Sequence, residues 1–108
     1  MYTRNISMKL KPNPFSLSEF TEILESEILP VLRRQKGFQD AISLIAPERN
    51  EAVAVSFWDK RENAEAYQRE KYPEALKALS RVVEGIPRVD TFEVATSTFR
   101  RIIASAET

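Results

Sequence analysis

Residues 38–58 read FQDAISLIAPERNEAVAVSFW, two runs rich in apolar and β-branched residues on either side of a short polar segment. This pattern predicts strands over residues 38–46 and 52–58, joined as an antiparallel hairpin by the segment that contains proline and asparagine. No residue of the second run is charged, on either face of the predicted strand. We therefore expect both faces of the hairpin to be covered in the folded protein.

Another strand is predicted over residues 4–11, ahead of the hairpin. Apolar residues at positions 6, 8 and 10 alternate there with polar residues, which is the two-residue period of a strand with one apolar face. If the apolar face packs against helices, Asn5 and Ser7 lie on the opposite face of the sheet. The polar segment PNP at residues 12–14 ends this strand.

Residues 16–36 predict a helix, because their apolar side chains recur at spacings of three and four residues. Ser16 and Glu19 have the spacing of a capping box at the start of this helix. Pro30 is expected to kink the helix or to begin a new turn, since proline removes one backbone hydrogen bond. Gly37 suits the left-handed residue that commonly follows a helix.

After the hairpin, the sequence predicts two more helices and a final strand. The helices are expected over residues 60–71 and 73–84, with the break before Pro73. Gly85 is expected to end the second of them. Residues 88–99 are rich in valine, threonine and phenylalanine and predict the last strand.

The predicted order of elements is therefore β-α-β-β-α-β. Its simplest packing is the ferredoxin-like fold of the α+β class, a sandwich with two helical layers on one face of a four-stranded antiparallel sheet. The length of 108 residues suits one domain over residues 1–108. Its core is expected over residues 4–99, and residues 100–108 form a C-terminal extension.

The second face of such a sheet has no helix to cover it. We expect Trp58, Ala54 and Ala41, or their neighbours, to be exposed there in a monomer. Exposed apolar patches of this kind usually mark an interface. The sequence therefore predicts a homodimer that associates through this face.

The composition excludes several kinds of chemistry. The chain has 16 Lys and Arg against 16 Asp and Glu, so it lacks the basic excess of a typical nucleic-acid binder. It has no cysteine and no histidine. Disulfides, thiolate metal sites, a cysteine nucleophile and a Ser-His-Asp triad are excluded. We expect no metal site, no cofactor and no nucleic-acid partner.

The sequence also carries no sign of a membrane protein. Its first residues are polar, and its apolar stretches are far shorter than the ~20 residues that span a bilayer. We expect a cytoplasmic protein without a membrane partner.

Four segments together resemble the antibiotic-biosynthesis-monooxygenase (ABM) proteins of the dimeric α/β-barrel superfamily. They are LPVLR at 29–33 leading to GF at 37–38, SFWD at 56–59, NAEAY at 63–67 and FEV at 92–94. The resemblance covers about residues 4–99. It is a pattern of fold and packing more than a catalytic signature.

The resemblance implies a homodimer whose two sheets face each other and enclose one cavity per subunit. Some of these proteins oxygenate aromatic polyketides or quinols without metal or flavin, others degrade haem, and others have no known activity. Asn5 matches the strand asparagine of the haem-degrading branch, and Tyr67 replaces its helix tryptophan. Leu76 aligns with its iron-ligating histidine, and leucine cannot ligate iron. Haem degradation is therefore not expected.

Five residues are candidates for lining the cavity and binding a substrate, and none is assigned a catalytic role: Asn5, Ser7, Trp58, Tyr67 and Tyr72. An amide or hydroxyl could orient a phenol or quinol and stabilise its anion. An indole could stack on a flat ligand. Each has a plainer alternative. For the first two it is a solvated strand face or an interface hydrogen bond, for tryptophan a core or interface anchor, and for at least one tyrosine helix packing.

Three functions remain open on the sequence alone. The first is a cofactor-independent monooxygenase that acts on a small hydrophobic aromatic molecule. The second is a non-catalytic dimeric protein of the same fold that binds a small molecule or serves in stress. The third is an RNA-binding module, which the same order of elements allows. The expected third strand lacks the glycine and the basic residue of that module's motif, which argues against it.

Overall fold

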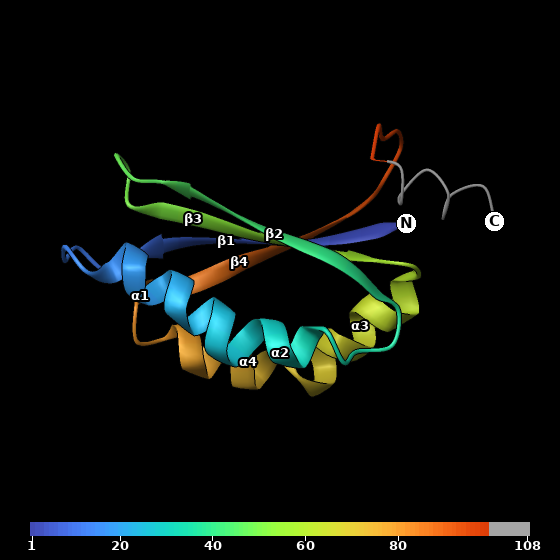
Figure 1. Ribbon diagram of the computed structural model, residues 1–108, viewed down its shortest axis with the longest axis horizontal. Helices are drawn as coiled ribbons and strands as arrows, with labels where there is room; N and C mark the ends of the chain where they lie inside the picture. Colours follow the sequence, from blue (N-terminus) through green and yellow to red (C-terminus); the bar gives the residue numbers. More distant parts are fainter. Residues whose placement is uncertain (100–108) are drawn as a thin grey trace.

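The computed structural model describes residues 1–99 of the chain, and its elements follow the predicted order β-α-β-β-α-β (Figure 1). Each helical part is divided into shorter segments. The elements are β1 (Tyr2–Leu10), α1 (Ser16–Ile23), the π-helical segment η1 (Leu24–Ile28), α2 (Leu29–Leu32), β2 (Phe38–Ala46), β3 (Glu51–Trp58), α3 (Arg61–Glu70), α4 (Tyr72–Leu79) and β4 (Val83–Glu93).

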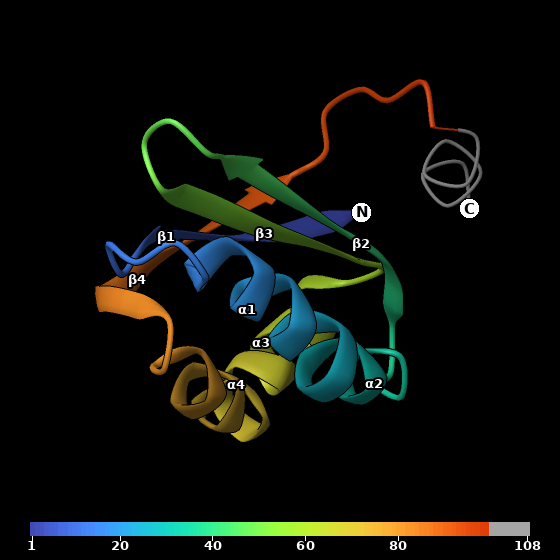
Figure 2. The same ribbon diagram turned by 60° about the vertical axis from the view of Figure 1, so that its left-hand side comes forward.

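The four strands form one sheet in the order β2-β3-β1-β4, and every neighbouring pair is antiparallel. All the helices lie on one face of this sheet (Figure 1). In the described part of the chain, no helix covers the other face (Figure 2), which we call the open face. The α+β class and the ferredoxin-like arrangement are confirmed.

The strand register decides which side chains point toward the helices. In β1, the buried residues Arg4, Ile6, Met8 and Leu10 occupy alternate positions and face the helices. Their neighbours in β1 therefore point toward the open face.

Trp58, Ala54 and Ala41, or their neighbours, were expected on the uncovered face, and for the three named residues this expectation is wrong. Ala54 pairs with Ile6, whose side chain packs under the helices, and Trp58 is fully buried. Ala41 pairs with Ser56 on that same side. Directly paired residues of an antiparallel sheet share a face, so all three turn toward the helices. The open face instead carries Leu44, Val53, Val55, Phe57 and Phe92.

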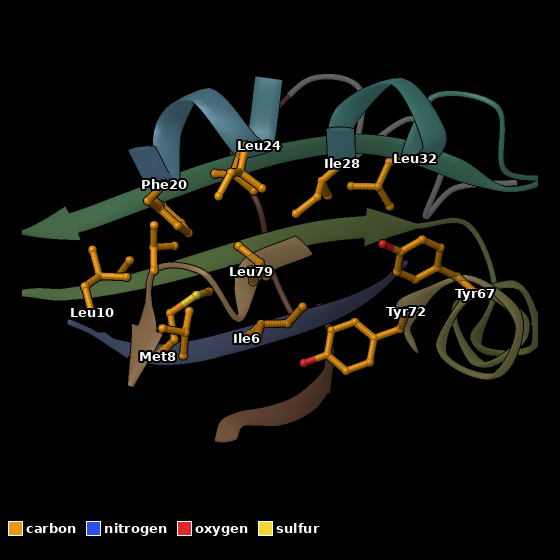
Figure 3. Packing of buried hydrophobic residues seen from close by; sticks show 14 of the residues in the cluster. Ile6, Met8, Leu10, Phe20, Leu24, Ile28, Leu32, Tyr67, Tyr72 and Leu79 are labelled. Atoms are coloured by element: carbon orange, nitrogen blue, oxygen red, sulfur yellow. The ribbon is translucent and has the colours of Figure 1, made fainter. Parts of the chain in front are cut away.

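The core fills the layer between the sheet and the helices (Figure 3). Buried residues at three- and four-residue spacing along the first helical part pack against β1; they are Phe20, Leu24, Ile28 and Leu32. The sequence predicted this stripe as Leu17, Phe20, Leu24, Ile28 and Val31; Leu17 and Val31 are only partly buried, and Leu32 takes the last buried position. Tyr67 and Tyr72 close the core at the end opposite Phe20 and Leu10 (Figure 3).

The predicted helix over 16–36 is interrupted before Pro30. The N–H of Leu29 donates to the carbonyl of Leu24 five residues back, which is the bond of a π-turn. Pro30 has no N–H and begins a new segment, α2. Gly37 has the expected left-handed conformation, with φ of 82°.

The capping box at the start of this helix is wrong. Ser16 is the first helical residue rather than the cap, and its Oγ donates 2.7 Å to the carbonyl of Lys11. Asn13 Oδ1 instead accepts a hydrogen bond from the Phe15 N–H. The loop that contains two prolines turns Ser16 into the interior, where its hydroxyl bonds to the carbonyl of Lys11.

The boundary between the last helix and the last strand also differs from the prediction. Helix α4 ends at Leu79, and β4 already begins at Val83. Val83 pairs with Leu10, so its β-branched side chain belongs to the sheet rather than to a helix. Gly85 lies inside β4, where the pairing with β1 shifts register. The strand ends at Glu93 rather than residue 99, and the predicted extension 100–108 lies outside the described residues.

None of the helices among residues 1–99 has the length and apolarity needed to cross a membrane.

Candidate functional site

A cavity of about 140 Å³ lies between the sheet and the helices. Strands β1, β2 and β3 form its floor, and the segments from α1 to α4 form its walls. Most of its lining is apolar, including Ile6, Ala54, Leu24 and Ile28. Exposed residues of α1, η1 and β2 also line it, so it opens to solvent between the first helical part and the edge strand.

One end of the cavity is polar, and Arg4 dominates it. Arg4 is only 2% exposed because it shares the helix-facing side of β1 with Ile6. Its partner in β3 is Ser56, whose small side chain leaves room for the guanidinium group. Two tyrosine rings flank that group: its central carbon lies 5.0 Å from the Tyr67 ring centre and 4.9 Å from that of Tyr72. This is the geometry of two cation–π contacts.

The two tyrosines reach the cavity from different helices. Tyr67 comes from α3, and Tyr72 is the first residue of α4, directly after Lys71, which separates the two helices. Both hydroxyl groups are directed toward the middle of the core (Figure 3). The break between α3 and α4 therefore places two phenol groups at the same end of the cavity.

Burial favours the neutral form of all three groups, and it therefore raises the tyrosine pKa values and lowers that of arginine. The pKa of Tyr67 is raised above 10.0, chiefly by burial, although the Arg4 charge works in the opposite direction. The pKa of Tyr72 is raised for the same reason. Burial lowers the pKa of the Arg4 guanidinium, yet arginine remains protonated in proteins. The cavity therefore holds a permanent cation beside two neutral phenols.

Arg4 has no anionic partner within residues 1–99. Its Nη2 donates to Gln68 Oε1, which is a neutral acceptor. Its Nε and the Tyr72 hydroxyl are both buried without any hydrogen-bond partner. Buried polar groups normally have partners, so two free groups at one place mark a site that a further molecule can satisfy.

The structure separates the five predicted site residues into two groups. Tyr67 and Tyr72 line the cavity. Asn5 pairs with Val55 and Ser7 with Val53, so both lie on the open face, outside this cavity. Any contact of these two with a cavity between subunits stays a prediction.

Trp58 serves the core rather than this cavity. Its indole N–H donates 2.9 Å to Ser56 Oγ, and its ring meets Phe38 edge to face with ring centres 5.7 Å apart. It also packs at 5.5 Å against the Tyr67 ring. Trp58 therefore holds a cavity residue in place from behind, which corresponds to the plainer interpretation of this residue.

Arg4 is the site residue that the sequence analysis missed. It stands two positions before Ile6, in phase with the apolar residues of β1, and charged residues at such positions are almost never buried without a partner. This position in phase with the apolar residues was the sequence signal that could have identified Arg4 as a buried residue. The family resemblance pointed to the neighbouring Asn5 as a candidate instead. Because side chains alternate along a strand, Asn5 lies on the opposite face of the sheet.

The described residues include no cluster of histidine, cysteine, aspartate or glutamate side chains that could hold a metal ion. A buried arginine and two tyrosines repel a cation and attract an anion, so this donor set suits an organic ligand rather than a metal.

No family model matches the chain, and no curated protein matches its sequence. Solved structures with the same fold are numerous. A monooxygenase from the gene ActVA-Orf6 of Streptomyces coelicolor, solved in complex with the ligand nanaomycin D, has a TM-score of 0.75 at 14% identity. The alignment covers 91% of this chain and 90% of that one.

Two further structures extend the comparison. SnoaB, a cofactor-independent oxygenase from Streptomyces nogalater, has a TM-score of 0.68 at 15% identity, over 92% of this chain and 97% of that one. A protein of unknown function from Nitrosomonas europaea has a TM-score of 0.73 at 15% identity, over 91% and 92% of the two chains. The fold of this chain is thus the one found in antibiotic biosynthesis monooxygenases, over nearly the full length of each protein.

Proposed function

We propose that this protein is a cofactor-independent monooxygenase that takes up a small hydrophobic aromatic molecule in the cavity beside Arg4. The observation that carries the proposal is an apolar cavity whose only buried charge is flanked by two phenol groups. Apolar pockets with a few convergent polar groups are typical ligand sites. The fold shared with a cofactor-independent oxygenase supports the same reaction class.

The size of the cavity narrows the ligand. A volume of about 140 Å³ is close to the ~150 Å³ of an engineered protein cavity that binds benzene. We therefore propose a single-ring aromatic, such as a hydroquinone, as the substrate. A larger ring system would need the first helical part to move away from β2.

The proposed reaction needs no reductant other than the substrate. A hydroquinone reacts with O₂ so that one oxygen atom forms a new bond to a ring carbon, the O–O bond breaks, and the other atom leaves as water. The product is a hydroxyquinone. The ring loses four electrons, which reduce both oxygen atoms. The protein has to bind the ring, exclude water and stabilise the negative charge on its oxygen.

A homodimer belongs to this proposal. The open face carries apolar side chains from β2, β3 and β4, and within residues 1–99 no helix covers them. Two such sheets packed face to face would remove this surface from water. Asn5 and Ser7 would then lie between the subunits.

Oxygen uptake with hydroquinone tests the proposal, with the non-enzymatic rate subtracted. Ala75 and Ala66 are both half-buried helical alanines, but only Ala75 is among the residues that line the cavity. Ala75→Leu fills the cavity and should lower kcat/KM by about tenfold or more, or ~1.4 kcal/mol. Ala66→Leu adds the same volume elsewhere and should leave the rate nearly unchanged.

Labelled O₂ identifies the reaction class. One labelled atom in a hydroxyquinone product supports monooxygenation. Tight binding of the ring without oxygen uptake would instead favour a non-catalytic binding protein of the same fold. Equal effects of the two leucine variants would remove the cavity as the site.

A further inference from the structure

We infer that Arg4 makes this cavity selective for an aromatic oxyanion, so that the ligand binds as a phenolate or enolate rather than as a neutral ring. This inference rests on the proposed function, because it specifies the chemical form of the molecule that the cavity takes up.

The first argument is the uncompensated charge. Arg4 has an exposed fraction of 2%, and no carboxylate within residues 1–99 forms an ion pair with it. By contrast, the arginines of the described chain that do form ion pairs, such as Arg61 and Arg81, are exposed. A buried charge normally requires a partner of opposite sign. An anionic ligand would supply it.

The second argument is the presence of hydrogen-bond donors without a partner. The Tyr67 and Tyr72 ring centres flank the guanidinium group at 5.0 and 4.9 Å from its central carbon. Within residues 1–99, Nη2 donates to Gln68, while Nε is buried without a partner. The unpartnered Tyr72 hydroxyl adds a second donor. An oxyanion accepts hydrogen bonds from both, and such charge-assisted bonds are the strong ones.

The third argument is the apolar remainder of the cavity. Apart from Arg4, Ser56 and the two tyrosines, the buried lining is aliphatic, with Ile6, Leu24 and Leu79 among its residues. The remaining polar lining residues are exposed; they are Thr21, Glu25 and Ser43. A small inorganic anion would leave this surface uncovered. An anion attached to one aromatic ring satisfies both the charge and the apolar wall. The same anion is the electron-rich form that O₂ oxidises most readily.

Binding of p-nitrophenol and nitrobenzene to the purified protein tests the inference. The two rings match in size, but only p-nitrophenol ionises, and its phenolate has its own visible absorption band. We expect bound p-nitrophenol to ionise at a pH about one unit below that of the free compound, which is about a tenfold preference for the phenolate. Nitrobenzene should bind with an affinity that does not change with pH.

Three variants identify the residue responsible. Arg4→Met should abolish the shift in ionisation, and Arg4→Lys, which keeps the charge, should retain most of it. Arg61 also lies over a tyrosine ring, at 6.0 Å from Tyr2, but it is exposed and outside the cavity. Arg61→Met should leave the shift unchanged. If Arg4→Met does not fold, Arg4→Gln removes the same charge with a polar side chain and should abolish the shift as well.

The possible failures are distinguishable. If both compounds bind and p-nitrophenol ionises as it does in water, selectivity for the anion is refuted while the aromatic site stands. If neither compound binds, the proposed single-ring site fails with it. If the ionisation of p-nitrophenol shifts equally in Arg4→Met, another group stabilises the phenolate and the proposed role of Arg4 is refuted.

Discussion

The central guanidinium carbon of Arg4 lies 4.9 Å from the centre of the Tyr72 ring, in a cavity where neither the Arg4 Nε nor the Tyr72 hydroxyl has a hydrogen-bond partner. Strand β1 supplies the charge and helix α4 supplies the ring. Residues that are distant in sequence thus meet at one end of the core. The Arg4 Nε and the Tyr72 hydroxyl lack hydrogen-bond partners within residues 1–99, and this is the observation that indicates a ligand site.

Removing the charge of Arg4 should not weaken the free protein. Arg4→Met keeps the length of the side chain and removes a buried cation without an anionic partner, at the loss of two cation–π contacts. The cost of burying a charge exceeds those contacts, so we expect the free energy of unfolding to stay equal or rise by about 1 kcal/mol. Urea denaturation measures it. A loss of several kcal/mol would show that Arg4 is a structural residue.

The buried tyrosines should make the protein sensitive to alkali. The pKa values of Tyr67 and Tyr72 are raised above 10.0 by burial, so the unfolded state releases these protons first as the pH rises. The unfolded state then binds fewer protons, and stability falls with pH. The contribution of neutral tyrosine is complete below about pH 9 and is lost above pH 10.

Thermal unfolding between neutral and alkaline pH measures this loss. Tyr72→Phe removes a hydroxyl without a partner and should make the alkaline decrease shallower, with little change at neutral pH. An identical decrease in the variant would mean that Tyr72 does not contribute to it.

Substitutions at two glycines allow the cost of backbone strain to be measured apart from the cost of steric crowding. Gly37 and Gly85 have φ values of 82° and 75°, a region that other residues rarely adopt. A Cβ at Gly37 would lie 2.2 Å from Asp59 Oδ1, whereas a Cβ at Gly85 would have nothing within 4 Å. Gly85→Ala should therefore cost only the backbone term, about 1 kcal/mol.

Gly37→Ala should cost about 3 kcal/mol, since it adds a clash between the turn from α2 to β2, which contains Gly37, and Asp59 just before α3. The carbonyl of Gly37 also accepts a hydrogen bond from the Asp59 N–H at 2.9 Å, so this turn cannot move away freely. Chemical denaturation of both variants measures the difference. Equal costs would show that the turn relaxes around the added methyl group.

The proposed dimer has a matched test in strand β2. Leu44 and Ile45 are adjacent and similarly exposed, at 53% and 49%. Leu44 pairs with Val53 on the open face, and Ile45 pairs with the buried Ala52 on the helix side. Leu44→Arg should dissociate a dimer formed through the open face, because it buries an unpaired charge there. Ile45→Arg should leave the dimer intact.

Analytical ultracentrifugation of the wild type and both variants measures the mass. A wild type that sediments as one chain at micromolar concentration would reject the dimer. Dissociation by Ile45→Arg alone would place the interface at the edge of the sheet instead.

Much of the fold was predictable because its signals are local. The alternation of apolar residues over β1, the spacing of Phe20, Leu24 and Ile28, and the two runs around Pro47 each report a periodicity of a few residues. The errors lie where contacts with residues distant in the sequence determine the secondary structure. Val83 looked like the end of a helix, but its pairing with Leu10 places it in the sheet.

The candidate site was predictable only in part, for a related reason. Tyr67 and Tyr72 were named for a cavity between two facing sheets because they flank a break between helices, which is a local feature; the cavity that they line lies inside one chain. Asn5 and Ser7 have suitable chemistry, but a one-residue step along a strand moves a side chain to the opposite face. That same step brings Arg4 into the cavity.

The sequence by itself determined the order of the elements, the apolar stripe of the first helical part and the absence of histidine and cysteine chemistry, because each depends on residue type and short spacing. Only the tertiary structure decided that Arg4, Tyr67 and Tyr72 meet in one cavity and that Trp58 is buried behind them. Contacts between β1, α3 and α4 depend on strand register and helix placement across the whole chain, and no short stretch of sequence contains that information.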